Sequence, residues 1–382
     1  MRDYDIIVYG ATGFTGRLVA EYLVRQGVTR WAMAGRSRAK LEEVRDLIGA
    51  PADTPLVVAD ADDPASLTAM AQSTRVVLTT VGPYQLYGAP LVAACVAAGT
   101  AYVDLCGEPA WMRHMIDAHH AAAQASGARI VFSCGFDSIP FDLGVLTLQE
   151  CAIAKYGHPA PRVKGRVRAM QGGFSGGTAA SLKATLAAAA RDPSLLGLLA
   201  SPFALTPGFS GPHQPTGLLP EFDATLNTWV APFIMAAINT KNVHRTNFLL
   251  GHRYGSDFVY DEMMVAGLGD MGKAAAEAIA RINPFAGDKG PKPGEGPSQE
   301  ERDNGHYDLL FVGLMPDGAR FDAVVTGDRD PGYGSTSKMM AETARCLLET
   351  EGAGGVWTPG ALLGTTLRDR LQDKAGLTFT AG

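Results

Sequence analysis

One short stretch near the N-terminus constrains the fold of this chain more than any other. The largely apolar run Asp5–Tyr9 ends in a turn with regularly spaced glycines, and a helical pattern begins within that turn. Small residues let a backbone approach a pyrophosphate, and a helix start offers unpaired N–H groups and a positive dipole end to the same anion. We therefore predict a dinucleotide-binding turn, with a tight turn that binds nothing as the alternative. Its residues are Gly10, Ala11, Thr12, Gly13, Phe14, Thr15 and Gly16.

The pattern after this turn predicts a doubly wound parallel sheet. Strand-like and helical segments alternate with short connections. The runs 75–81, 101–105 and 129–133 are mostly apolar without alternation, which is typical of strands buried on both faces. Such alternation indicates a parallel sheet with helices on both sides. Between these three strands we expect helices over residues 89–98 and 109–126. Later in the chain we expect helices over residues 178–191 and 334–349.

A change of pattern near residue 150 indicates a second domain. Strand-like segments there alternate polar and apolar residues, and glycine and proline become frequent. We predict an α/β fold with a Rossmann-like domain over residues 1–149 and an inserted α+β substrate or dimerisation domain over residues 150–330. A C-terminal helical segment, residues 331–382, returns to the Rossmann domain. Residues 201–220 and 288–304 are expected to be loops, because glycine and proline are concentrated there.

The residues after the second predicted strand indicate which dinucleotide is bound. A carboxylate at this position suits NAD, whereas cations suit the additional phosphate of NADP. Here Arg36 and Ser37 are followed by Arg38 and Lys40, and no acidic residue occurs before Glu42. Arg36 can bind the phosphate in a bidentate manner and Ser37 can donate to it. Solvated cations are the alternative, but the dipole of a helix start disfavours cations. We therefore predict NADP(H) as the cofactor.

Two further loops are candidates for the same site. Asp60 follows the third predicted strand, where the adenine ring of a dinucleotide usually lies. Val81, Gly82 and Pro83 follow the fourth, where they can flank the nicotinamide ribose. Either loop could instead be a capped turn between a strand and a helix.

Several motifs together resemble the saccharopine dehydrogenase-like oxidoreductases, and within them the actinobacterial trans-acting enoyl reductases. The resemblance implies a Rossmann domain that the C-terminal helix completes. It also implies a lipid or polyketide acyl substrate, which an acyl carrier domain of a synthase could present. The matching segments are residues 9–16, 34–37, 81–84, 102–108, 134–140, 330–334 and 355–360.

The candidate catalytic residues follow from where ligands bind in such sheets, beyond the carboxyl ends of the strands. Reduction of an enoyl thioester requires a hydride at the β-carbon and a proton at the α-carbon. Tyr84 is our first candidate for the proton donor and Ser138 the second, while Asp137 could orient a neighbouring group. The alternatives are that Tyr84 packs against the cofactor and that Asp137 caps the helix near Pro140.

Two other functions remain open at this stage. An imine or carbonyl reductase acting on a small amino- or oxo-acid would need cationic side chains as carboxylate receptors. Arg166, Arg168 and Arg245 are the internal candidates for that role. A protein that binds NADP without turning it over is the other alternative.

Composition narrows the possible partners and the compartment. The formal net charge of −6 argues against general binding to nucleic acid or acidic membranes. The five cysteines have no disulfide or metal-binding spacing, which is typical of reduced cytoplasmic thiols. We expect no transmembrane segment and a cytoplasmic protein, with peripheral contact to membrane or lipid left open. The apolar runs Leu195–Leu199 and Trp229–Ile238 could bind an acyl chain, or form core or a homodimer interface.

Overall fold

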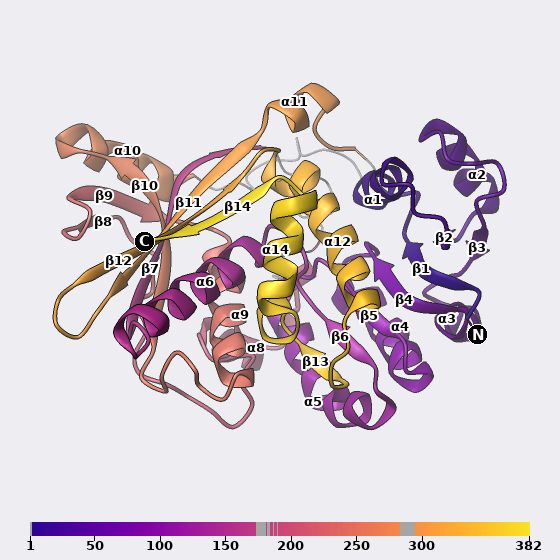
Figure 1. Cartoon of the computed structure of the whole chain (residues 1–382), viewed down its shortest axis with the longest axis horizontal. Coiled ribbons are helices and arrows are strands. Elements are labelled where there is room, and N and C mark those ends of the chain that lie inside the picture. The colour runs from indigo at the N-terminus through magenta and orange to yellow at the C-terminus, as the bar shows by residue number, and fades with distance from the viewer. Residues whose placement is uncertain (1, 173–180, 182–183, 186, 189, 283–294) are drawn as a thin grey trace.

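A computed structural model places the strands of the chain in two seven-stranded sheets, which lie at opposite sides of the molecule (Figure 1). The structure describes residues 2–172, 181, 184–185, 187–188, 190–282 and 295–382. The two sheets differ in strand direction. The first is parallel throughout, and the second is mostly antiparallel.

The first sheet has the doubly wound order expected from the sequence. Its strand order is β13-β6-β5-β4-β1-β2-β3, and every neighbouring pair is parallel. The chain winds outward from β1 in both directions, so the strand order reverses between β1 and β4, where such sheets bind dinucleotides. The strands are β1 (Tyr4–Tyr9), β2 (Trp31–Gly35), β3 (Leu56–Val58), β4 (Thr74–Thr79), β5 (Ala101–Val103), β6 (Arg129–Val131) and β13 (Gly355–Trp357).

Helices cover both faces of this sheet. Successive residues of a strand point to opposite faces, so Ile6 and Val8 of β1 pack into one core, and Ile7 and Tyr9 into another. On the side of Ile6 lie α1 (Phe14–Arg25), α2 (Arg38–Leu47) and α12 (Thr336–Glu349), and on the other lie α3 (Pro64–Ser73), α4 (Tyr84–Ala98) and α5 (Pro109–Ser126). The predicted Rossmann-like architecture is therefore confirmed.

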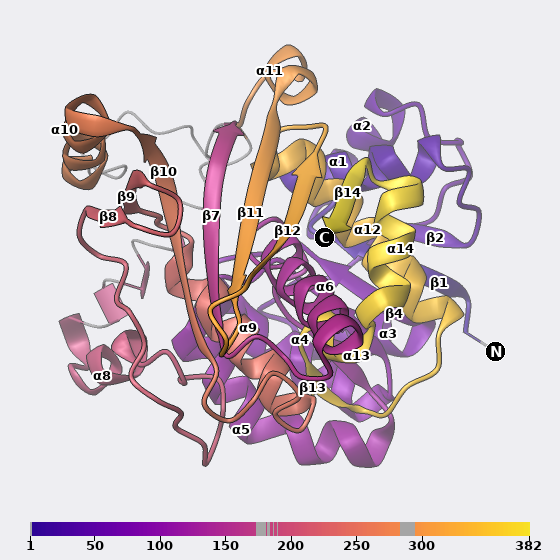
Figure 2. The ribbon, with the colours of Figure 1, turned by 60° about the vertical axis from the view of Figure 1, so that its left-hand side comes forward.

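The second sheet stands beside the first and shares one of its cores. Figure 2 shows β7, β11 and β12 side by side, with α6 next to them. The strand order is β14-β12-β11-β7-β10-β9-β8, and only the β7–β10 pair is parallel. Its strands are β7 (Arg162–Gln171), β8 (Glu221–Asp223), β9 (Thr228–Pro232), β10 (Val259–Gly267), β11 (His306–Leu314), β12 (Arg320–Gly327) and β14 (Leu377–Ala381).

Helix α6 (Ile139–Tyr156) joins the two sheets physically. It begins just after β6 of the first sheet and packs against β11, β12 and β14 of the second. A Cβ added to Gly144 would lie 2.3 Å from the ring of Phe311, so glycine is needed for this close approach. The remaining helices are α8 (Ser194–Ala200), α9 (Ala236–Leu249), α10 (Gly269–Arg281), α11 (Gln299–Asn304), α13 (Pro359–Leu362) and α14 (Gly364–Lys374).

The C-terminal segment is more than the helix expected from the sequence. It opens with a π-helical turn, η1 (Pro331–Ser335), which continues into α12. Strand β13 then joins the edge of the first sheet, as a segment that returns to the Rossmann domain should. Strand β14, however, pairs with β12 of the second sheet. The expectation of a purely helical segment over residues 331–382 was therefore wrong in this respect, because two short strands of three and five residues give little periodic signal.

Smaller differences concern loops and helix ends. Residues 201–220 contain no regular element, as expected, but the loop predicted over residues 288–304 ends in the short helix α11. The described residues within 178–191 are helical up to Arg191, and the others lie outside the described part of the chain. Helix α4 begins at Tyr84 rather than near Ala89. No helix in the described part of the chain is long and apolar enough to cross a bilayer.

Candidate functional site

The glycine-rich turn has the geometry that a pyrophosphate requires. Gly10 has a φ of +90°, and the N–H of Gly13 donates to its carbonyl oxygen at 2.9 Å. A Cβ added to Gly16 would lie 2.1 Å from that same oxygen, so only glycine fits there. Helix α1 begins at Phe14, and its first N–H groups have no acceptor within the helix. These free N–H groups and the narrow turn fit the binding of a dinucleotide.

The cations after β2 are available to a ligand. Arg36 is exposed and has no hydrogen bond or ion pair within the described residues. Ser37 caps α2, because its Oγ accepts from the N–H of Lys40 at 3.4 Å, which leaves the hydroxyl proton free to donate. Burial and the nearby charge of Asp60 together raise the pKa of Tyr9 to about 12, while the charge of Arg36 opposes the rise. Arg36 and Asp60 therefore both lie near the end of β1.

The loop after β3 is a capped turn. The Oδ1 of Asp60 accepts from the N–H of Asp62 at 3.1 Å, and the backbone N–H of Asp60 donates to the Oγ of Ser66 at 3.0 Å. Asp63 caps α3 through the N–H of Ala65. The turn follows β3, the neighbour of β2 in the sheet, and contact between Asp60 and the adenine ring stays a prediction.

The loop after β4 touches the glycine-rich turn directly. A Cβ added to Gly10 would lie 2.8 Å from the Oγ1 of Thr80 and 2.9 Å from a methyl carbon of Val81. Gly82 and Pro83 follow, joined by a cis peptide bond. Val81, Gly82 and Pro83 therefore line the edge between β1 and β4, where the sequence placed them. Their contact with the nicotinamide ribose stays a prediction.

Tyr84 is a packing residue in this structure. Its ring is 4% exposed and lies 5.6 Å from the ring of Trp111 between centroids. The hydroxyl donates to the carbonyl of Thr79 at 3.3 Å and accepts from the N–H of Leu105 at 3.4 Å. Burial raises its pKa well above the ordinary value. The hydroxyl proton is thus used inside the protein, in agreement with the packing alternative.

Ser138 is also engaged internally. It is fully buried, and its hydroxyl donates to the carbonyl of Asp137. The Nδ2 of Asn242, on helix α9, donates to the same hydroxyl oxygen at 2.5 Å. Sequence reasoning missed Asn242, because it lies far from Ser138 in the chain and no local motif marks it.

Asp137 differs from the other two candidates. Its side chain is half-buried and makes no hydrogen bond within the described residues, so it does not cap α6. Burial raises its pKa to about 6. A carboxyl group in this state exchanges its proton close to neutral pH, which is the property of a general acid. Of the three predicted catalytic residues, Asp137 is the one whose polar atoms are free to meet a ligand.

Two buried carboxylates hold the loops of the site together. Asp104 accepts from the hydroxyl of Tyr102 and from the N–H groups of Cys106 and Ser133, at 2.9 to 3.0 Å. Burial nevertheless raises its pKa to about 7. Glu108 accepts from the first two N–H groups of α4, at 2.9 and 2.8 Å. This long-range cap explains why α4 begins earlier than its sequence indicates.

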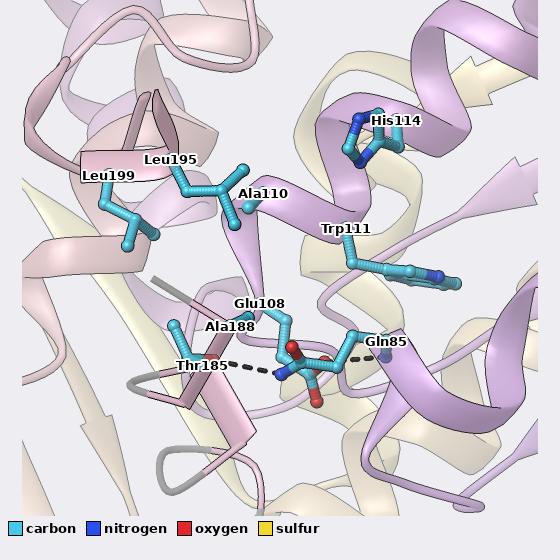
Figure 3. A pocket seen from close by; sticks show the side chains of 9 residues that line it. All are labelled: Gln85, Glu108, Ala110, Trp111, His114, Thr185, Ala188, Leu195 and Leu199. Carbon is cyan, nitrogen blue, oxygen red and sulfur yellow. Dashed lines mark hydrogen bonds between the residues drawn. The ribbon is translucent and has the colours of Figure 1, made fainter. Parts of the chain in front are cut away.

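A small apolar cavity of about 130 Å³ opens beside these loops (Figure 3). Trp111 forms one wall, and Leu195 and Leu199 of α8 face it. The Nε2 of Gln85 donates to the Oγ1 of Thr185 at 3.2 Å and thereby joins the two walls. The lining residues are Gln85, Glu108, Ala110, Trp111, His114, Thr185, Ala188, Leu195 and Leu199. The other apolar run considered for acyl binding, Trp229–Ile238, contributes instead to the packing of β9 and α9, with Val230 and Ala231 fully buried.

The arginines considered as carboxylate receptors all have partners inside the protein. Arg166 is paired with Asp223 at 2.9 Å and Asp261 at 2.8 Å. Arg168 is paired with Asp308, and Arg245 donates to two backbone carbonyls. Within the described residues, no group of three His, Cys, Asp or Glu side chains could hold a metal ion.

Comparison with known proteins identifies the family. Residues 6–131 match the model of the saccharopine dehydrogenase NADP-binding domain. A Mycobacterium tuberculosis protein, provisionally named a trans-acting enoyl reductase, is 41% identical, and the match covers 97% of this chain and 96% of the relative. A trans-acting enoyl reductase of Mycobacterium leprae is 38% identical with the same coverage. The chain belongs to the trans-acting enoyl reductase family.

Solved structures extend the likeness at the level of fold. Saccharopine dehydrogenase (L-Glu forming) of Saccharomyces cerevisiae superimposes with a TM-score of 0.57 at 11% identity, covering 99% of this chain and 100% of the other. The NADP-binding domain match and the free Arg36 agree on the cofactor. This member of the trans-acting enoyl reductase family is therefore an NADP(H)-dependent oxidoreductase.

Proposed function

We propose that this protein reduces the carbon–carbon double bond of an α,β-unsaturated acyl thioester. One observation carries the proposal: the cavity beside the loops after β4 and β5 has apolar walls and no lysine or arginine among its described lining residues. Glu108, its one carboxylate, would repel an amino- or oxo-acid. A neutral acyl chain suits these walls, because contact with Trp111, Leu195 and Leu199 removes its methylenes from water.

Different residues of the chain would bind the cofactor and supply the proton in this reaction. The glycine-rich turn, Arg36 and Ser37 would hold the cofactor, and bound NADPH supplies a hydride for the β-carbon. Asp137 holds the proton that the α-carbon takes up, and a pKa of about 6 allows it to exchange that proton with solvent. The product is the saturated thioester, with one hydrogen added at each carbon. Asp104 and Glu108 fix the loops that surround the reacting atoms.

The substrate we propose is a lipid or polyketide acyl chain carried on the acyl carrier domain of a synthase. The mycobacterial relatives are named trans-acting, which is compatible with a substrate that another protein presents. Leu86, Tyr87 and Leu196 are exposed and lie next in sequence to cavity residues, where a carrier could dock. A homodimer and a cytoplasmic location are further predictions of the sequence.

Steady-state NADPH oxidation tests the proposed reaction. The purified protein is offered 2-enoyl thioesters of increasing chain length, attached to coenzyme A or to a carrier domain, alongside cyclic imines and 2-oxo acids. We expect NADPH consumption with the enoyl thioesters alone. Consumption with imines or oxo acids alone would contradict the proposal. NADPH binding without consumption across the panel would favour a binding protein.

A cavity variant tests whether the apolar walls hold the acyl chain. Ala188→Leu adds three carbons to the cavity lining. We expect kcat/KM for long enoyl thioesters to fall about tenfold, because each displaced methylene loses roughly 0.8 kcal/mol of burial. Short enoyl thioesters should react as before. Met271→Ala, an exposed residue of α10 that does not line the cavity, is the control. An equal loss at every chain length would contradict this role.

A further inference from the structure

The first turn of α1 is covered by a segment from the distant half of the chain. Gly296 lies so close to Phe14 that a Cβ added to it would be 2.5 Å from the ring. Tyr333 of η1 meets the same ring edge-on, with centroids 5.2 Å apart. Phe14 belongs to the glycine-rich turn, and its N–H is one of those left free at the helix start. Residues around the second sheet therefore reach the cofactor turn itself.

Two guanidinium groups flank this phenylalanine. The Cζ of Arg17 and the Cζ of Arg302 each lie 5.5 Å from the centroid of the Phe14 ring. Arg17 is on α1, drawn in indigo in Figure 1, whereas Arg302 is on α11, drawn in orange. The two cations thus come from separate parts of the chain to the same turn of helix.

The position of Arg302 is well defined by its backbone. Ser298 and Glu301 form a capping box at the start of α11, and the N–H of Arg302 donates to the carbonyl of Ser298. The carbonyl of Arg302 accepts from the N–H of Asp330 at 3.1 Å. Its guanidinium donates to the carbonyl of Pro297 at 2.6 Å. Helix α11 therefore presents the guanidinium toward Phe14 rather than to open solvent.

The local charge balance leaves room for an anion. Arg17 has no hydrogen bond or ion pair within the described residues. Asp330 is the carboxylate close to Arg302, but its two oxygens accept from the N–H groups of Tyr333 and Gly334 at 3.0 and 2.7 Å. Arg17 and Arg302 thus lie at a free helix start, and η1 already uses the oxygens of Asp330. A pyrophosphate is the anion that such a turn binds.

We propose that Arg302 binds the pyrophosphate of NADP(H), so that the second half of the chain takes part in holding the cofactor. Arginine suits this role because its planar fork can donate two hydrogen bonds to phosphate oxygens. Arg36 and Arg302 then recognise different parts of one ligand. Arg36 meets the phosphate that distinguishes NADP from NAD, and Arg302 meets the pyrophosphate that both share.

Cofactor affinity measured in the absence of acyl substrate tests this assignment. The variant Arg302→Met keeps an apolar stem against Phe14 and removes the charge. We expect the dissociation constants of NADPH and NADH to rise by the same factor, about tenfold, since a hydrogen bond to a charged group is lost. Adenosine 2′-phosphate, which has no pyrophosphate, should bind the variant as it binds the unmodified protein. Arg302→Lys should retain part of the affinity.

The matched control is Arg329→Met. Arg329 lies near α11 and is paired with Asp303, but it does not contact Phe14. We expect it to bind both dinucleotides normally. Unchanged NADPH affinity in Arg302→Met would overturn the proposal. An equal loss of adenosine 2′-phosphate binding would also overturn it, because Arg302 would then support the fold of the site rather than the pyrophosphate.

Discussion

The two ends of the carboxyl edge of the first sheet differ in how their polar side chains are partnered. At the end of β2, Arg36 is exposed and makes no hydrogen bond or ion pair with any described residue, and Ser37 keeps a free proton. Beyond β4 and β6, the hydroxyls of Tyr84 and Ser138 are buried, and both are hydrogen-bonded inside the protein. Asp137 is the exception at that end.

This difference reflects two tasks. A side chain that recognises a phosphate can stay hydrated until the ligand binds, because the ligand brings the opposite charge. A group that takes part in a reaction is more effective where water is excluded and neighbouring dipoles are fixed. Internal hydrogen bonds fix those dipoles, and they also occupy side chains that looked like proton donors in the sequence. On the proposed function, we therefore expect Arg36 to select the cofactor and Asp137 to transfer the proton.

The largest expected effect is at the reaction end. Asp137→Asn removes the proton that we assign to the α-carbon, and kcat with an enoyl thioester should fall about a hundredfold or more. In the unmodified enzyme kcat should decline as pH rises above about 6, because burial places the pKa of Asp137 there. Steady-state kinetics across a pH series measures both. The assignment fails if the variant keeps the same pH profile.

The pH dependence of protein stability tests the raised pKa of Asp137 independently of catalysis. Its pKa rises from 3.8 to about 6 on folding, so the folded protein retains a proton that the unfolded chain releases between those values. Stability is therefore lost as pH rises through this range. Asp137→Asn should raise the melting temperature at about pH 8 and change it little at about pH 4. A lower melting temperature at the higher pH would indicate a structural role instead.

A smaller effect, on binding alone, is expected at the adenosine end. Arg36→Ala should weaken NADPH about thirtyfold through loss of a bidentate contact to phosphate, and should leave NADH within about twofold. Fluorescence titration with each dinucleotide measures the ratio. An equal loss of affinity for NADPH and NADH would contradict the comparison, since Arg36 would then not contact the additional phosphate of NADP.

The smallest effect is expected for Tyr84→Phe. The variant loses hydrogen bonds with the backbone of Thr79 and Leu105, so the free energy of unfolding should fall by about 1 kcal/mol. Activity with enoyl thioesters should stay within about threefold. Chemical denaturation and initial rates measure the two quantities. A large loss of kcat with unchanged stability would return Tyr84 to the role of proton donor.

The turn at the end of β1 could be predicted because its determinants are local, whereas the contacts of its residues with the cofactor stay predictions. Gly10, Gly13 and Gly16 lie within one turn, and Arg36 follows the next strand directly. The alternation of strands and helices likewise predicted the first sheet. Such features depend on neighbouring residues, whose spacing can be read along the chain.

The reaction end could be predicted only in part because distant segments build it. Asn242 reaches Ser138 from α9, and Glu108 caps α4 from beyond β5. Those contacts decide which hydroxyls are free, and no spacing along the chain reveals them. Strand β14 was missed for a similar reason, since its pairing with β12 gives a five-residue segment its structure.

The most direct test of the central claim follows the hydride and the proton in one turnover. The enzyme is mixed with an enoyl thioester and NADPH that carries deuterium at the transferred position, in ordinary water, and the product is analysed by mass spectrometry and NMR. The account predicts a saturated thioester with deuterium at the β-carbon and a solvent-derived hydrogen at the α-carbon. Recovery of the unreduced thioester would contradict this prediction. So would a saturated product without deuterium at its β-carbon, or reduction of imines or ketones in place of the thioester.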